Sequence, residues 1–192
     1  MEIPENYSRE SVKLAVVGLS PSGAEAPFDD YSWEVWSLPW FPYPRVDRWF
    51  EIHDYWVSGG YYKCGKTRAD IVDWLNALEA PIFMSETHAD IPRSMAYPFD
   101  GVRRLLGKAL NTSKDEPYLE SSIAAMLGRA CLYLRPGDTI GLWGVDVMDG
   151  YADQRPNIEY ILGFLRGRGV KIIVHPCSKL LTTEHRLGRY GK

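Results

Sequence analysis

Short apolar runs alternate along the chain with longer segments in which apolar residues recur every three or four positions. Continuous runs of this length are typical of strands that are buried on both faces, as in a parallel sheet. Six of them predict strands, at residues 14–19, 34–38, 49–53, 81–85, 139–145 and 171–174. The first run passes directly into a Ser-Pro-Ser-Gly turn, which indicates a central strand.

Between these runs, the apolar spacing predicts helices at residues 68–78, 121–134 and 156–166. In the first, Ile71, Leu75 and Leu78 fall near one helical face. Pro136 stops the second, and Pro156 suits the first turn of the third. Strands that alternate with helices predict an α/β fold with a mostly parallel sheet of about six strands and helices on both faces.

Polar residues follow nearly every predicted strand. The strand ends carry Ser20-Pro21-Ser22-Gly23, His53-Asp54, Ser85-Glu86-Thr87-His88, Gly144-Val145-Asp146 and His175-Pro176-Cys177-Ser178. In an open parallel sheet the ligand crevice lies beyond the carboxyl ends of the strands, because loops and helix starts gather there. The sequence therefore predicts a ligand-binding protein.

Composition limits the kind of protein. The 192 residues, 45% of them hydrophobic, predict a single domain over residues 1–192. A net charge of −3 supplies no uniform basic field, so nucleic acid is not the favoured partner. The chain starts without a secretory signal, and no apolar stretch approaches the roughly 20 residues of a membrane span, so we expect a cytoplasmic protein. Cys64, Cys131 and Cys177 lack CxxC spacing, and we expect reduced thiols.

Three motifs, in matching order and spacing, resemble those of a known group of proteins. Residues 14–23 look like the Gly-x-Gly-Pro-Ser opening of bacterial lipooligosaccharide sialyltransferases, motility-associated glycosyltransferases and archaeal hydroxymethylpterin diphosphokinases. Residues 120–130 and 139–146 are similar to their Thr-Ser-Gly helix and the strand that ends in Gly-x-Asp. Residues 176–181 resemble their closing Pro-x-Ser-x-Leu-Leu.

This resemblance implies a Rossmann-like nucleotide pocket. The implied nucleotide-binding residues are Gly18, Ser20, Pro21, Ser22 and Gly23 after the first strand, Ser121 and Ser122 at a helix start, Gly144 and Asp146 on the crevice floor, and Ser178. Apart from the resemblance, Arg155 near the Asp146 loop is a candidate to steady the leaving phosphate if the protein is an enzyme. Residues 46–53 and 154–160 also resemble small phage-encoded proteins with this fold and no settled function.

Two departures separate the chain from the sialyltransferases. Ser20 replaces the second glycine of the opening motif, which limits how closely the backbone can approach a phosphate. The chain also lacks the lid insertion that carries their general-base histidine, and no residue here matches that histidine. Nucleotide binding is therefore better supported than sugar transfer.

His53 is the strongest candidate for a general base. It follows a predicted strand, and the adjacent Asp54 would orient its imidazole, which titrates near neutral pH. The alternatives are a structural histidine or a metal site made of His53, Asp54, His88 and Asp146. No short ligand spacing supports that metal site, so we predict no metal and no other cofactor.

Three further features allow other readings. Residues 60–67 match the P-loop pattern GxxxxGK[ST], although the polar run before them suits a solvated loop and a helix cap better. Trp40 and Tyr43 are candidates for stacking a base or a sugar, with core packing as the alternative. The basic tail at residues 179–192 either clamps phosphate or is solvated.

These observations favour a protein that binds a nucleotide or nucleotide-sugar and resembles a sialyltransferase-like glycosyltransferase. In that reading His53 deprotonates the acceptor. The rival is a protein that sequesters a nucleotide signal without turnover, and a P-loop NTPase is less favoured. The sequence does not determine the base, the sugar, the acceptor or the oligomeric state.

Overall fold

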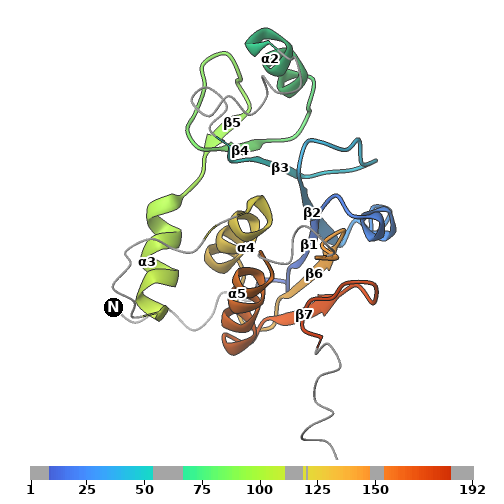
Figure 1. Ribbon diagram of the computed structural model, residues 1–192, viewed down its shortest axis with the longest axis vertical. Helices are drawn as coiled ribbons and strands as arrows, with labels where there is room; N and C mark the ends of the chain where they lie inside the picture. Colours follow the sequence, from blue (N-terminus) through green and yellow to red (C-terminus); the bar gives the residue numbers. More distant parts are fainter. Residues whose placement is uncertain (1–8, 54–66, 111–118, 120, 148–153, 183–192) are drawn as a thin grey trace, which may run out of the picture.

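The computed structural model describes residues 9–53, 67–110, 119, 121–147 and 154–182. These residues form one parallel sheet of seven strands in the order β5-β4-β3-β2-β1-β6-β7 (Figure 1). The strands are β1 (Lys13–Val17), β2 (Trp33–Ser37), β3 (Arg48–Glu51), β4 (Ile82–Met84), β5 (Ser94–Ala96), β6 (Thr139–Trp143) and β7 (Lys171–Val174). The helices are the short 3-10 helix η1 (Pro21–Glu25) and α2 (Arg68–Asn76), α3 (Phe99–Leu110), α4 (Ser122–Tyr133) and α5 (Arg155–Gly167).

Alternate residues of each strand pack into different layers. In β1, Leu14 and Val16 contact the cluster that includes α3, α4 and α5, while Ala15 and Val17 face the opposite layer. There the sheet is covered by the segment after η1, including Phe28, and further along by α2 through Leu75. Figure 1 shows α3, α4 and α5 gathered on one side, with α2 near β3 and β4. The prediction of an α/β fold with a parallel sheet is confirmed.

The expected number of about six strands was too low. The additional strand, β5, has only three residues, and Met95 and Ala96 are exposed at the edge of the sheet. A strand this short and exposed lacks a buried apolar run, so its sequence carries little signal. The expected helices did not include α3 either, although the buried Val102 and Leu106 stand four residues apart. That spacing was the signal for a helix.

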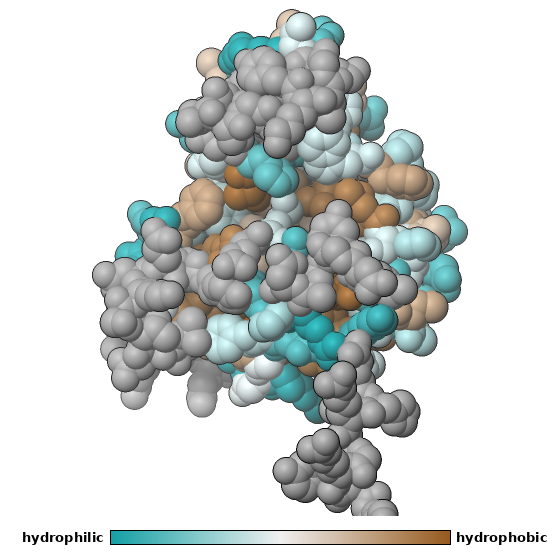
Figure 2. Space-filling view, viewed as in Figure 1, coloured by the Kyte–Doolittle hydropathy of each residue, from teal (hydrophilic) through white to brown (hydrophobic). Residues whose placement is uncertain are grey.

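The chain order creates a switch point between β1 and β6. From β1 the chain proceeds outward through β2 to β5, and then returns to place β6 on the other side of β1. The connections after β1 and β6 therefore leave in opposite directions and open a crevice at the carboxyl edge of the sheet. Figure 2 shows apolar surface on the face below α2, between the upper and lower parts of the molecule.

Two glycine backbones hold the strands together at this switch point. Beyond the last pair of β1 and β6, the Gly18 N–H donates to Trp143 O at 2.8 Å and the Ser20 N–H to Gly144 O at 3.0 Å. A Cβ on Gly18 would lie 2.3 Å from Gly144 O, and a Cβ on Gly144 would lie 2.4 Å from Gly18 O. Gly144 also has φ +65°, which glycine adopts at least cost.

We predict that Gly18→Ala destabilises the protein by about 1–3 kcal/mol, because the added carbon must displace backbone atoms. Gly163→Ala is the matched control, since Gly163 lies inside α5 and an added Cβ meets nothing within 4 Å. The control should stabilise the protein by about 0.5–1 kcal/mol through helix propensity. Urea denaturation at a constant m-value measures the stability change in each variant. Equal changes in Gly18→Ala and Gly163→Ala would contradict the close approach of the two strands as the cause.

Candidate functional site

A cavity of about 380 Å³ lies beyond the carboxyl ends of β1, β2, β3 and β6. Its size is within the range of small-molecule sites. The lining residues come from the loops after these strands and from the starts of α4 and α5: Gly18, Leu19, Ser20, Leu38, Trp40, His53, Ser121, Ser122, Ile123, Gly144, Val145, Asp146, Val147, Gln154 and Ile158. Of the predicted site residues, the structure brings together Gly18, Ser20, His53, Ser121, Ser122, Gly144 and Asp146 in this crevice.

Asp146 lines the crevice, and Ser22, which is not among the lining residues, supports it from behind. Ser22 Oγ donates to Asp146 Oδ1 at 2.5 Å and accepts the Gly144 N–H at 2.8 Å. Ser22 is 4% exposed and Asp146 is 5% exposed. Both hydrogen-bonding functions of Ser22 are thus used within the protein. Among the described residues only Ser22 donates to the Asp146 carboxylate, so its other oxygen is available to a ligand hydroxyl.

The start of α4 forms another wall. Ser121 is the N-cap of this 12-residue helix, and its Oγ accepts the Ala124 N–H at 3.1 Å. Ser121, Ser122 and Ile123 all line the cavity. Unpaired backbone N–H groups and the helix dipole make a helix start favourable for an anionic group. The arrangement places a site suited to phosphate beside the carboxylate of Asp146, which suits hydroxyl groups.

His53 is paired with Glu51. His53 Nδ1 lies 2.7 Å from Glu51 Oε1, and the two side chains are 55% and 0% exposed. This hydrogen bond raises the pKa of His53, partial burial opposes the rise, and the negative charge of Glu51 adds to it. Asp54, the expected orienting carboxylate, lies outside the described residues. In an extended strand, residues 51 and 53 point to the same side. This alternation was the sequence signal that Glu51 could pair with His53.

Several other predicted residues support the crevice from behind. Ser178 Oγ donates to Val145 O at 2.6 Å and accepts the Leu180 N–H at 3.2 Å, so it braces the loop after β6. Gly23 is buried, and a Cβ there would lie 2.3 Å from Tyr43 Oη. Pro21 is exposed at the start of η1. None of these three predicted residues is among the residues that line the cavity.

Arg155 and Tyr43 have partners that sequence reasoning did not foresee. Arg155 Nε donates to Glu159 Oε1 at 2.8 Å on α5, and its guanidinium also reaches the Thr182 carbonyl. Tyr43 Oη donates to Gly18 O at 2.7 Å. Arg155 and Tyr43 do not line the crevice, whereas Trp40 does. A phosphate-binding role for Arg155 would require it to leave these partners.

The first turn of α5 supplies polar groups that the sequence analysis missed. Gln154 and Ile158 line the crevice. Between them, Asn157 is 1% exposed, and within the described part of the chain neither its side-chain oxygen nor its nitrogen has a hydrogen-bond partner. In the sequence, only their position directly after the loop that follows β6 indicated that these residues belong to the site. The α5 start therefore belongs to the site together with the α4 start.

The competing motifs lie elsewhere or outside the described residues. Residues 60–66 of the P-loop pattern are not described, while Thr67 caps α2 in a reciprocal pair with Asp70. No group of three or more His, Cys, Asp or Glu suited to a metal occurs in the part of the chain that the structure describes. Of the cysteines, Cys131 and Cys177 form no disulfide, and burial raises the pKa of Cys131 to about 12.

Residues 183–192 of the basic tail lie outside the described residues. Within the described segments, no helix combines the length and apolarity that crossing a membrane requires.

We predict that Ser22→Ala lowers the free energy of unfolding by about 1–3 kcal/mol, because it leaves a buried carboxylate and a buried N–H unpaired. Ser20→Ala is the matched control, since Ser20 belongs to the same loop but its hydroxyl has no hydrogen bond among the described residues. The control should change stability by less than about 0.5 kcal/mol. Thermal and urea unfolding compare the variants, and an equal loss in both would argue against the Ser22 bridge.

We also predict that His53 titrates above about 6.5, the ordinary value, because Glu51 favours the imidazolium. Glu51→Gln keeps the side-chain shape but removes the charge, so the pKa of His53 should fall. NMR titration of the imidazole protons follows both proteins. His88 is the internal reference, and an unchanged His53 pKa in the variant would contradict the pairing.

The fold is similar to one solved structure in particular, the sialyltransferase CstII from Campylobacter jejuni in complex with a substrate analogue, CMP-3FNeuAc. The likeness covers 84% of this chain and 79% of that chain, with a TM-score of 0.50 and 15% sequence identity. No protein-family model matches the chain, and no curated protein matches it. The chain thus has a distantly sialyltransferase-like α/β fold, as the three sequence motifs implied.

Proposed function

We propose that the protein binds a nucleotide-activated sugar in the crevice between β1 and β6 and transfers the sugar to an acceptor. The observation that carries this proposal is Asp146, a buried carboxylate on the crevice floor with one oxygen bonded to Ser22 and the other available. A carboxylate in this position is suited to accept hydrogen bonds from ribose or sugar hydroxyls. The fold shared with a sialyltransferase that binds a CMP-sugar analogue supports the ligand class.

The start of α4 supplies the complementary site for the phosphate. Ser121 and Ser122 line the crevice, and free N–H groups at a helix start stabilise negative charge without a metal or an arginine. When the bond between the anomeric carbon and the phosphate oxygen breaks, negative charge grows on the leaving nucleoside phosphate. A helix start already oriented toward that phosphate would stabilise it most in the transition state.

His53 is the proposed general base. His53 Nδ1 faces Glu51 Oε1 at 2.7 Å, so the proposed base is Nε2, in the tautomer that carries its proton on Nδ1. Nε2 would take the proton of the acceptor hydroxyl, whose oxygen then bonds to the anomeric carbon as the nucleoside phosphate leaves. The raised pKa makes His53 a stronger base, but also requires a higher pH to deprotonate it. The expected rate therefore rises with pH through that raised pKa.

The test combines calorimetry with product analysis. CMP-, UDP- and GDP-activated sugars and ATP are titrated into the protein, and released nucleotides and glycosylated acceptors are identified by mass spectrometry. Asp146→Asn should weaken binding of the preferred nucleotide-sugar about 10- to 100-fold, by loss of charge-assisted hydrogen bonds. Asp29→Asn is the control, because Asp29 is exposed and lies outside the crevice lining.

His53→Asn should keep the nucleotide-sugar affinity and lower turnover by about 10²- to 10⁴-fold. His88→Asn, a histidine outside the crevice lining, should leave turnover unchanged. In Glu51→Gln, the rising limb of the pH profile should move to lower pH. Equal single-turnover rates for His53→Asn and the wild type would exclude His53 as the base.

The same measurements address the other hypotheses. Tight nucleotide binding with no product would favour a protein that sequesters a nucleotide signal. ATP hydrolysis that depends on Lys66 would favour the P-loop hypothesis. The relation to small phage-encoded proteins stays a prediction from residues 46–53 and 154–160.

A further inference from the structure

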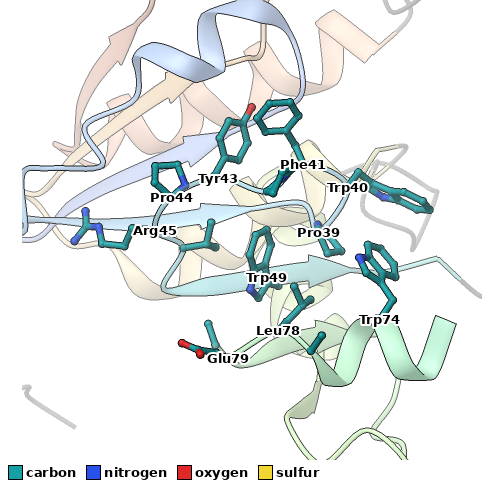
Figure 3. Close-up of a pocket in the computed structure, with 14 residues that line it drawn as sticks. Pro39, Trp40, Phe41, Tyr43, Pro44, Arg45, Trp49, Trp74, Leu78 and Glu79 are labelled. Atoms are coloured by element: carbon teal, nitrogen blue, oxygen red, sulfur yellow. The ribbon is translucent and has the colours of Figure 1, made fainter. Parts of the chain in front are cut away.

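A second cavity, of about 470 Å³, lies between the loop after β2 and the C-terminal end of α2. We call it the aromatic groove; Trp40, Phe41, Tyr43, Trp49, Trp74 and Leu78 are among its lining residues. Figure 3 shows Trp40 and Trp74 facing each other at one end, with Phe41 and Tyr43 along another wall. The function proposed above does not use this groove.

The groove and the crevice share a residue. Trp40 lines both cavities, so they meet at this side chain. His53, the proposed base, also lines the crevice. A ligand lying in the groove would therefore extend past Trp40 toward the place where the proposed transfer occurs.

Strand β3 provides a second connection between the two cavities. Trp49, Glu51 and His53 are spaced by two residues and thus follow one side of the extended chain. Trp49 lines the groove, and His53 lines the crevice. Strand β3 ends at Glu51 and His53 follows it, so four residues of chain separate Trp49 from His53 by at most about 13 Å. The groove thus begins on the same side of β3 as the paired imidazole, at a distance that a short chain-like ligand can bridge.

Two aromatic side chains of the groove remain partly open, while Trp49 is buried. Trp40 is 43% exposed and Phe41 is 49% exposed. The rings of Trp40 and Trp74 have centroids 5.2 Å apart at an interplanar angle of 45°, and those of Phe41 and Tyr43 are 4.6 Å apart at 46°. Tyr43 also stacks on Phe28, with centroids 5.1 Å apart, so the surface accessible to a ligand is that of Trp40 and Phe41.

A sugar ring matches such a surface. A pyranose presents C–H groups on its faces and hydroxyls around its edge, so a face can stack on an aromatic ring while the edge stays in water. Prolines at positions 39, 42 and 44 fix the loop that carries the exposed rings, which lowers the entropy lost on binding. Glu79, also in the lining, adds a polar group at the boundary.

From this juxtaposition we infer that the aromatic groove is a carbohydrate-binding site that holds the acceptor sugar chain, with its reacting hydroxyl directed past Trp40 toward His53. The assignment of the bound sugar as acceptor rests on the proposed transferase function. The presence of a carbohydrate site in the groove does not.

Saturation-transfer NMR with cellobiose, chitobiose and lactose tests the groove without any nucleotide. At least one of these saccharides should show transfer to its ring C–H protons with the wild-type protein. Phe41→Ala and Trp74→Ala should reduce affinity about tenfold, as expected for the loss of a stacking ring. Met95→Ala is the control, because Met95 is 41% exposed but lies outside the groove and should leave saccharide binding unchanged. Circular dichroism confirms that each variant is folded.

Calorimetry with CMP on the same variants separates the two cavities. Trp40→Ala should weaken both saccharide and nucleotide binding, whereas Phe41→Ala should weaken saccharide binding alone. Nucleotide binding without binding of any saccharide would overturn the groove assignment and leave the proposed function intact. Saccharide binding without nucleotide binding would keep the carbohydrate site and overturn its acceptor role. Binding of a decaproline peptide with no saccharide binding would also overturn the assignment, in favour of peptide docking.

Discussion

Beyond their last paired residues, β1 and β6 stay so close that neither Gly18 nor Gly144 has room for a side chain. The other parts of the crevice depend on this contact. Because the two backbones are in contact, the hydroxyl of Ser22 reaches both the Gly144 N–H and the Asp146 carboxylate. Ser22 thereby joins the loop after β1 to the loop after β6, beneath the crevice. A wider gap would leave Asp146 without the donor that orients it.

The two buried acids near the crevice differ in their partners, and this gives them different chemistry. Glu51, fully buried, is bonded to an imidazole, while Asp146 is bonded to a neutral hydroxyl. Burying a carboxylate is costly unless hydrogen bonds replace its water. Glu51 meets this cost with a basic group whose proton affinity it increases, which is useful for proton transfer. Asp146 keeps one oxygen for other hydroxyls, which is useful for binding.

The loop between β2 and β3 gives the molecule a second cavity. Tyr43 anchors this loop through its bond to the Gly18 carbonyl, the same carbonyl that approaches Gly144. Trp40 and Phe41 stay partly open on the other part of the loop. The tightly packed switch point thus also positions the exposed aromatic rings. Two aromatic residues of one loop thus differ: Tyr43 holds the loop by a hydrogen bond, and Trp40 stays 43% exposed.

The sequence by itself determined the elements whose signal is local. Apolar runs predicted six of the strands, because a strand buried on both faces needs continuous apolar residues, and the polar strand ends predicted the edge where the crevice lies. Strand β5 and helix α3 were not foreseen; the former is too short and exposed to have a pattern. Tertiary structure alone decided which polar groups line the crevice and which support it from behind. Ser22 meets Asp146 across 124 residues of chain, so its inward orientation depends on how β1 pairs with β6 and is not encoded in its own neighbourhood.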